Sequence, residues 1–127
     1  AASIGEIAKA FEGRMLVGAG TVTTTHMVEL THEAGGLFII SPNTNADVIR
    51  RTRELGMVSM PGALTPTEIT NAWDWGADFV KLFPVGALGL DYLKAITAPL
   101  SHEALRRSAI NLTERRKAWC NDLGSEI

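Results

Sequence analysis

The chain repeats a pattern of strand, loop and helix with a period of 20 to 22 residues. Its four short apolar runs begin at residues 15, 37, 57 and 79, so their starts lie 22, 20 and 22 residues apart. Each run is followed by Gly, Pro, Asn or Thr and then by apolar residues at helical spacing. Strands that are apolar throughout and alternate with helices indicate a parallel sheet covered by helices. The repeat therefore favours a (βα) barrel or a doubly wound sheet.

Three of the expected helices begin with residues that can cap them. Thr65 precedes Pro66, and Glu68 completes a capping-box pattern. Asn45 is expected to start a helix over residues 46–55, and Thr24 or Thr25 to start another. Glycines follow each helix. The apolar stripes are expected to comprise Met27, Leu30 and Ala34 in the first helix, Val48, Ile49, Thr52 and Leu55 in the second, and Ile69, Ala72 and Trp73 in the third.

Unusual residues gather where the expected strands end, which favours the barrel over the doubly wound sheet. In a (βα) barrel, functional groups lie at the C-terminal ends of the strands. These ends carry Gly18-Ala19-Gly20-Thr21, Ser41-Pro42-Asn43, Pro61-Gly62 and Lys81 to Pro84. A closed barrel needs eight strands, and four are visible. We therefore predict an α/β chain in which residues 1–102 form a partial TIM-type barrel of about four parallel strands and residues 103–127 form a divergent helical or irregular tail.

Composition excludes several classes of function. The chain has 127 residues, 46% of them hydrophobic, and a net charge of -2 from interspersed acids and bases. This balance argues against nucleic-acid binding and a membrane-surface patch. No apolar run approaches the length of a membrane span, so a cytoplasmic location is the expectation. One cysteine and three scattered histidines predict neither a disulfide nor a metal site, and no cofactor is expected.

Lys81 is the strongest single indication of chemistry. It lies within Phe79-Val80-Lys81-Leu82-Phe83, an apolar run that reads as a buried strand. Desolvation would favour the neutral amine, which is the nucleophile of Schiff-base enzymes. A strand-end lysine whose stem packs while its head reaches water is the alternative, and it remains open here. Because alternate residues share a face of a strand, Phe79 and Phe83 are expected to flank Lys81.

Four motifs together closely resemble the bacterial KDPG/KHG aldolases. The motifs are Val17-Gly18-Ala19-Gly20-Thr21-Val22, Ile40-Ser41-Pro42-Asn43, residues 60–68 from Met60 to Glu68, and Phe79 to Pro84. These enzymes are class I pyruvate aldolases, which are lyases, and they cleave 2-keto-3-deoxy-6-phosphogluconate or 4-hydroxy-2-oxoglutarate to pyruvate and an aldehyde. The resemblance covers residues 2–102 in order. It implies an aldolase of carbohydrate metabolism that works without a cofactor on a small keto acid.

The resemblance also implies roles for individual residues. Lys81 corresponds to the lysine that forms the Schiff base with the keto group of pyruvate. Thr21 corresponds to a threonine that holds the carboxylate and carbonyl of pyruvate. Pro42 and Phe83 correspond to residues that shape the same pocket. A homo-oligomer is the expected assembly.

The chain also departs from the family pattern. No residue matches the glutamate and arginine that the family carries on the strand before these motifs, and Ser108-Ala109 stand where the family has paired glycines for phosphate. We therefore expect an interior piece of the barrel, roughly its strands three to six. Two alternatives to an active aldolase stay open, namely a non-catalytic scaffold and a remnant that binds pyruvate without turnover.

Overall fold

Helices and strands alternate along the chain as the repeat predicts. The computed structural model describes residues 2–84, 88–89, 91–92, 94–96 and 98–100. The elements in chain order are α1 (Ala2–Ala10), β1 (Gly18–Ala19), α2 (Thr25–Glu33), β2 (Phe38–Ile40), α3 (Ala46–Glu54), β3 (Val58–Met60), β4 (Gly62–Ala63), α4 (Pro66–Asp74) and β5 (Lys81–Leu82). The predicted tail and the boundary at residue 102 lie outside the described residues.

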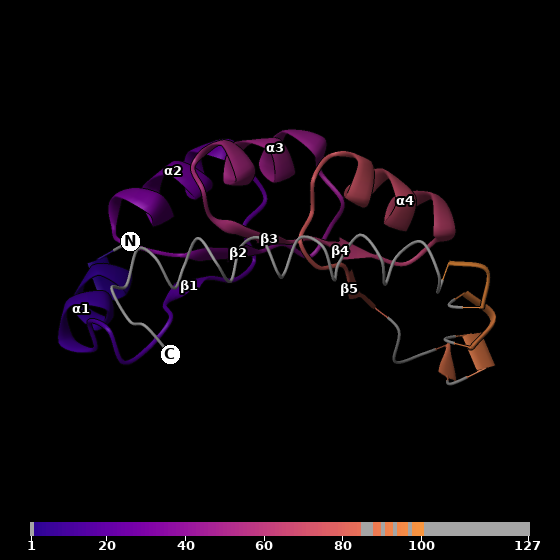
Figure 1. The fold of residues 1–127 in the computed structure, drawn as a ribbon, viewed down its shortest axis with the longest axis horizontal. Helices are drawn as coiled ribbons and strands as arrows, with labels where there is room; N and C mark the ends of the chain where they lie inside the picture. The colour runs from indigo at the N-terminus through magenta and orange to yellow at the C-terminus, as the bar shows by residue number, and fades with distance from the viewer. Residues whose placement is uncertain (1, 85–87, 90, 93, 97, 101–127) are drawn as a thin grey trace, which may run out of the picture.

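The described strands are all parallel and follow one another in space as they do in sequence. β1, β2 and β3 form one sheet, with Phe38 opposite Gly18 and Val58 opposite Phe38. β4 pairs with β5, and only Pro61 separates β3 from β4. The sheet is curved, with α2, α3 and α4 on its convex side, so this part of the chain forms an arch (Figure 1). Consecutive parallel strands with helices on the outer face are the construction of a (βα) barrel.

The hydrophobic core lies between the strands and the outer helices in three clusters. The first centres on Val22, Val28, Ile39, Val48 and Met57, the second on Ile49, Ala72 and Ala77, and the third on Ala63, Ile69 and Ile96. The members of the three clusters are each at most 4% exposed. This layer fixes one face of every strand against the helices and leaves the other face on the concave side.

Helix starts follow the sequence closely. Thr24 caps α2, Asn45 caps α3, and Thr65 caps α4 in a complete capping box with Glu68. The predicted stripe of α2 is wrong, however, because the helix buries Val28 and Thr31. The Thr31 hydroxyl donates to the Met27 carbonyl at 2.8 Å, so this polar residue is satisfied in the core. Met27 and Leu30 are each 38% exposed instead.

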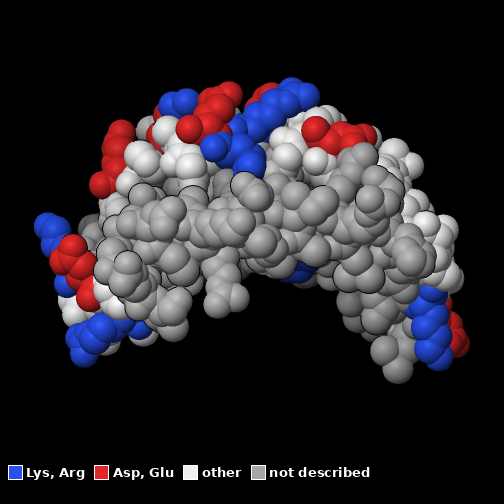
Figure 2. All heavy atoms as spheres, viewed as in Figure 1, with Lys and Arg blue, Asp and Glu red and all other residues white. Residues whose placement is uncertain are grey.

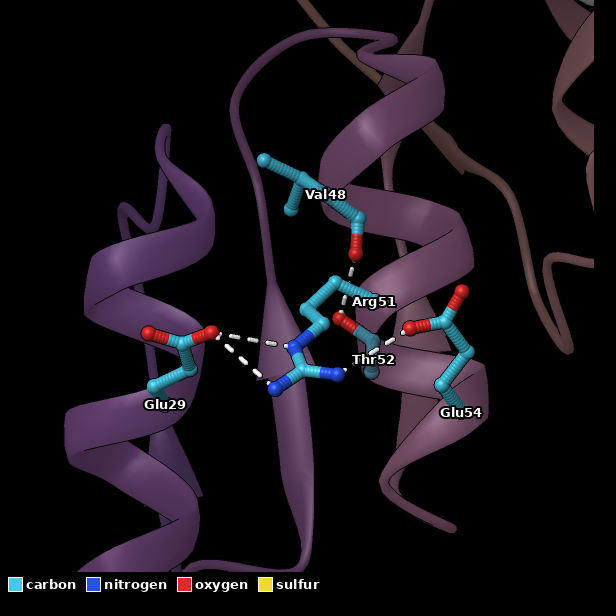
Figure 3. Close-up of polar contacts among 5 residues, drawn as sticks. All are labelled: Glu29, Val48, Arg51, Thr52 and Glu54. Atoms are coloured by element: carbon cyan, nitrogen blue, oxygen red, sulfur yellow. Dashed lines mark hydrogen bonds and ion pairs between the residues drawn. The ribbon is translucent and has the colours of Figure 1, made fainter.

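An arginine on the outer surface ties two neighbouring helices together. Arg51 of α3 donates from Nε to Oε1 of Glu29 in α2 at 3.1 Å, and its Nη1 contacts Oε2 of Glu54 at 3.1 Å (Figure 3). The hydrogen bond to Glu54, followed by that to Glu29, raises the pKa of the Arg51 guanidinium. Thr52, buried on the same helix, donates to the Val48 carbonyl at 2.7 Å (Figure 3). An ion pair between Arg51 and Glu29 thus joins α2 and α3 at the surface, and Val28 and Val48 pack together beneath it.

Acidic and basic side chains are interspersed over these outer helices (Figure 2). No single sign of charge dominates the outer rim in that view. Within the part of the chain that the structure describes, no helix is long and apolar enough to cross a membrane.

Replacing Glu68 with Gln is expected to flatten the dependence of stability on acid pH. Backbone N–H groups of Thr65 and Leu64 donate to the Glu68 carboxylate and lower its pKa from the ordinary 4.5. A carboxyl whose pKa is lower in the folded state stabilises the fold above the unfolded pKa, and this stabilisation is lost as the pH falls through the folded pKa. The free energy of unfolding, measured by urea titration at a series of pH values below 4.5, checks this. An unchanged slope in the variant would contradict it.

Candidate active site

Main-chain hydrogen bonds fix the position of Lys81 at the end of the curved sheet. Its N–H donates to the Pro61 carbonyl at 2.9 Å, and the Phe83 N–H donates to the Ala63 carbonyl at 3.0 Å. These bonds set Lys81 directly opposite Gly62 of β4. The lysine is therefore carried by a strand and not by a mobile loop, which suits a group that must meet a substrate in one geometry.

Lys81 faces the concave side of the sheet, together with the two aromatic residues that the sequence predicts beside it. Val80 and Leu82 pack against the core under the helices. Since side chains alternate along a strand, Phe79, Lys81 and Phe83 take the opposite face. The Lys81 Nζ lies 4.4 Å from the centroid of the Phe83 ring, within the range of a cation–π contact. The predicted neighbourhood of Lys81 and Phe83 is confirmed.

The predicted burial of Lys81 is wrong. The residue is exposed, and so are its flanking rings, Phe79 at 38% and Phe83 at 44%. The reason lies in the sheet: β5 pairs with β4 on one side, and no other described strand pairs with its second edge. Only a closed barrel surrounds an inward side chain on every side. The Phe83 ring therefore lies beside the amine, but no described strand covers the other edge of β5.

Thr21 stands out because its backbone adopts a left-handed conformation, with φ of 58°. It is the one residue other than glycine among those described that does so. This conformation is costly for a β-branched residue, by about 1–3 kcal/mol. Ala19 and Val22 both pack into the first core cluster, although strict alternation would place Ala19 and Thr21 on that face. The turn at Thr21 breaks the alternation and leaves its side chain exposed at the end of β1.

Replacing Thr21 with Gly is expected to stabilise the fold by about 0.5–1 kcal/mol. The left-handed conformation costs a β-branched residue more than glycine costs in chain entropy. The midpoint and slope of urea unfolding give this free energy. Thr23→Gly is the matched control, since Thr23 is exposed nearby without a positive φ, and it is expected to destabilise. A destabilised Thr21→Gly variant would argue against backbone strain at this position.

Pro42 is brought next to the strand position that faces Lys81. A side-chain carbon built on Gly62 would lie 2.4 Å from the Pro42 carbonyl oxygen and 2.7 Å from its carbonyl carbon. The Thr44 hydroxyl donates to the Gly62 carbonyl at 2.7 Å and holds the same loop against β4. The loop after β2 thus crosses onto β4 at the residue paired with Lys81. Only glycine leaves room for this close approach.

Gly62 belongs to this site, although its residue type alone predicted no role for it. Its signal is a glycine placed directly after Pro61 at the end of an apolar strand, a position that often marks close approach of another backbone. Thr21 comes from a strand that is not paired with β4 or β5. β2 and β3 lie between β1 and the strand pair of β4 and β5. The structure therefore brings Lys81, Phe83 and Pro42 together at β4 and β5, while Thr21 lies at the end of β1.

The described residues offer no group of three or more His, Cys, Asp or Glu side chains that could hold a metal ion. The site is thus an amine with aromatic neighbours on the concave side of a parallel sheet.

A family described as KDPG and KHG aldolase matches residues 1–117 of the chain. The chain belongs to the KDPG and KHG aldolase family. The match extends past residue 102, and the domain boundary expected there stays a prediction.

Individual members of this aldolase family are similar over most of the chain. The chain is 47% identical over 85 residues to a probable 2-dehydro-3-deoxy-6-phosphogalactonate aldolase of Rhizobium meliloti (strain 1021), which covers 67% of this chain and 40% of that protein. It is 40% identical over 122 residues to the 2-dehydro-3-deoxy-6-phosphogalactonate aldolase of Escherichia coli (strain K12), which covers 96% of this chain and 60% of that protein.

Solved structures of the family share the fold. A structure described as native KDPGal superposes with a TM-score of 0.72 at 40% identity, covering 76% of this chain and 47% of that one. A KDPG aldolase from Legionella pneumophila, with pyruvate captured at low pH as a covalent carbinolamine intermediate, gives a TM-score of 0.69 at 28% identity, with the same two coverages. The predicted partial barrel is confirmed by these matches. The chain spans 40% to 60% of the length of the proteins compared here.

Proposed function

We propose that this chain carries the Schiff-base chemistry of a class I pyruvate aldolase, with Lys81 as its catalytic residue. The observation that carries the proposal is the place of Lys81, on a strand at the concave side of the sheet, with its Nζ 4.4 Å from the Phe83 ring centroid. No salt bridge joins Lys81 to another described residue, so no described carboxylate competes for its amine. The pyruvate covalently captured in the Legionella relative supports the same chemistry here.

In the proposed reaction, the neutral amine of Lys81 attacks the keto carbon of a 2-keto acid. A carbinolamine forms, loses water and becomes a protonated imine. The bond between the third and fourth carbons of the substrate then breaks, and its electron pair moves toward the imine nitrogen to give an enamine. The hydroxyl proton of the fourth carbon leaves as that carbon becomes the aldehyde product. Protonation of the enamine and hydrolysis release pyruvate and restore the amine.

Three further residues are proposed to bind the pyruvate half of the substrate. Phe83 flanks the amine, and Pro42 comes from the loop that crosses onto Gly62. Thr21 is proposed to hold the carboxylate and carbonyl of pyruvate. Its strained backbone supports a functional role, because such strain concentrates at functional sites. The substrate is proposed to be 2-keto-3-deoxy-6-phosphogluconate or 4-hydroxy-2-oxoglutarate, and the names of the two relatives above add the phosphogalactonate analogue to the compounds to be tested.

Trapping with borohydride tests the proposal directly. The protein is incubated with pyruvate and sodium borohydride, digested, and its peptides are analysed by mass spectrometry. The expected result is a reduced pyruvate adduct on Lys81. Folded protein without an adduct on this residue would overturn the proposal. Cleavage of each candidate keto acid is measured separately through the pyruvate that is released.

A pyruvate-binding remnant is the second candidate, and the exposure of Lys81 favours it. Water that reaches the amine weakens the electrostatic stabilisation of charge during bond cleavage, while reversible adduct formation can persist. This candidate predicts an adduct with borohydride but no release of pyruvate from any of the three keto acids. Release of pyruvate from one of them would decide for the aldolase.

We further propose that the protein works in the cytoplasm as a homo-oligomer. Apolar side chains near the β1 edge support an assembly, since Met15, Leu16 and Leu37 are 52%, 51% and 40% exposed. One structural neighbour is a designed cage made by fusing symmetric oligomeric domains. Light scattering gives the mass in solution, and a monomer at micromolar concentration would contradict the assembly.

A further inference from the structure

A buried carboxylate lies at the base of the strand that carries Lys81. Asp78 is 2% exposed, and its Oδ2 accepts the Ser59 N–H at 2.8 Å. Its Oδ1 accepts a hydrogen bond of 2.9 Å from Nη1 of Arg53, a residue of α3. The Arg53 side chain approaches to 3.5 Å from the point where a Cβ on Gly76 would lie. Three segments of the chain, α3, β3 and the connection after α4, thus meet at this carboxylate.

The Asp78 carboxylate supplies a hydrogen-bond acceptor that the main chain between β3 and β5 does not provide. The Ser59 carbonyl accepts the N–H groups of Asp78 and Phe79 at 3.0 and 3.2 Å. The Ser59 N–H points to the same side and receives its acceptor from the Asp78 side chain. Pro61, the next residue facing β5, has no N–H to donate. The hydrogen bond from the Ser59 N–H to the Asp78 side chain therefore takes the place of a main-chain hydrogen bond. It lies three residues before Lys81, which pairs with Gly62.

The register of β5 determines which way Lys81 points. β5 comprises two residues and pairs with one described strand. A slip by one residue would turn Lys81 into the core and Leu82 onto the concave side. Val80 and Leu82 oppose such a slip by packing, and Asp78 opposes it by binding Ser59, a fixed point on β3. A carboxylate with two charge-assisted or main-chain partners is a strong restraint of this kind.

We propose that Asp78, held in place by Arg53, is a positioning residue that sets the register of β5 and so keeps Lys81 on the concave side. The inference rests on the proposed role of Lys81 as the Schiff-base lysine. A structural role alone predicts that substitution lowers global stability. The positioning role predicts in addition a local loosening of β5 and slower adduct formation per folded molecule.

The experiment compares Asp78→Ala, Asp78→Asn and Val28→Ala with the unaltered chain. Val28 lies in the first core cluster, away from β5, so Val28→Ala reports loss of stability alone. Two quantities are measured. One is the rate of borohydride trapping with pyruvate, divided by the folded fraction from circular dichroism. The other is hydrogen exchange by NMR at the amides of Lys81 and Phe83, relative to the amide of Leu37, which donates to the Val17 carbonyl before β1.

Asp78→Ala is expected to slow trapping by about tenfold, because a small misplacement of a reacting group carries a large loss of rate. Exchange at Lys81 and Phe83 should accelerate more than at Leu37. Asp78→Asn keeps the shape and one acceptor oxygen, and an intermediate loss of about threefold is expected. Where the alanine variant does not fold, Asp78→Asn carries both measurements. Val28→Ala should show neither the slower trapping nor the selective exchange.

A normal trapping rate per folded molecule in the Asp78 variants would overturn the inference. The inference would also be overturned if Val28→Ala slowed trapping and accelerated exchange at Lys81 as much as the Asp78 variants do. If the unaltered chain forms no adduct, the proposed function fails. Exchange at Lys81 then still decides whether Asp78 sets the register, because that measurement needs no substrate.

Discussion

Replacing Lys81 with Met is expected to abolish the pyruvate adduct completely. Methionine keeps an unbranched chain of similar length but has no amine to attack the keto carbon. Stability should change by no more than about 0.5 kcal/mol, because Lys81 is exposed and its main contact is the cation–π pair with Phe83. Mass spectrometry after borohydride reduction measures the adduct, and urea unfolding measures the stability.

Lys94→Met provides the control for this variant. The Lys94 side chain is 79% exposed, and its Nζ lies 3.7 Å from Oδ1 of Asp91. Its replacement removes an exposed lysine outside the proposed site and should leave the adduct on Lys81 unchanged. An adduct that persists in Lys81→Met, on whichever lysine, would contradict the assignment. If Lys81→Met raises the free energy of unfolding by much more than about 0.5 kcal/mol, the Lys81 ammonium is buried, as predicted from the sequence.

Replacing Gly62 with Ala is expected to destabilise the fold by about 3 kcal/mol. The added carbon would meet the Pro42 carbonyl oxygen at 2.4 Å and the Ser41 oxygen at 3.0 Å. Both are backbone atoms that cannot rotate away, so the strands must separate, and overpacking of this kind costs about 1–3 kcal/mol. The same shift moves Pro42 away from the strand position opposite Lys81. Trapping by the folded fraction should therefore slow as well.

Gly20→Ala is the matched control for Gly62→Ala. No atom lies within 4 Å of a carbon built on Gly20, and its backbone does not adopt a left-handed φ. Its free energy of unfolding should stay within about 0.5 kcal/mol of that of the unaltered chain. Equal unfolding midpoints for the two alanine variants would show that the loop after β2 is not packed against Gly62 as described.

The helices were predictable because their signals are local. A capping box needs only Thr65 and Glu68 three residues apart, and the sequence shows both. The phase of α2 was not predictable in the same way. Met27 and Leu30 have the apolar spacing, but Thr31 satisfies its own hydroxyl within the helix and is buried in place of them. Packing against α3 and β2 decides the rotation, and the sequence does not contain that information in local form.

The candidate site divides along the same line. Side chains alternate along any extended backbone, so the sequence alone determined that Lys81 and Phe83 share one face. The helical pattern between successive strands likewise determined that the strands are parallel. Burial depends on what lies across space, so only the tertiary structure decided that Lys81 meets water. Only the tertiary structure likewise decided that Pro42 approaches Gly62 and that Asp78 binds the Ser59 N–H, because each contact joins segments distant in sequence.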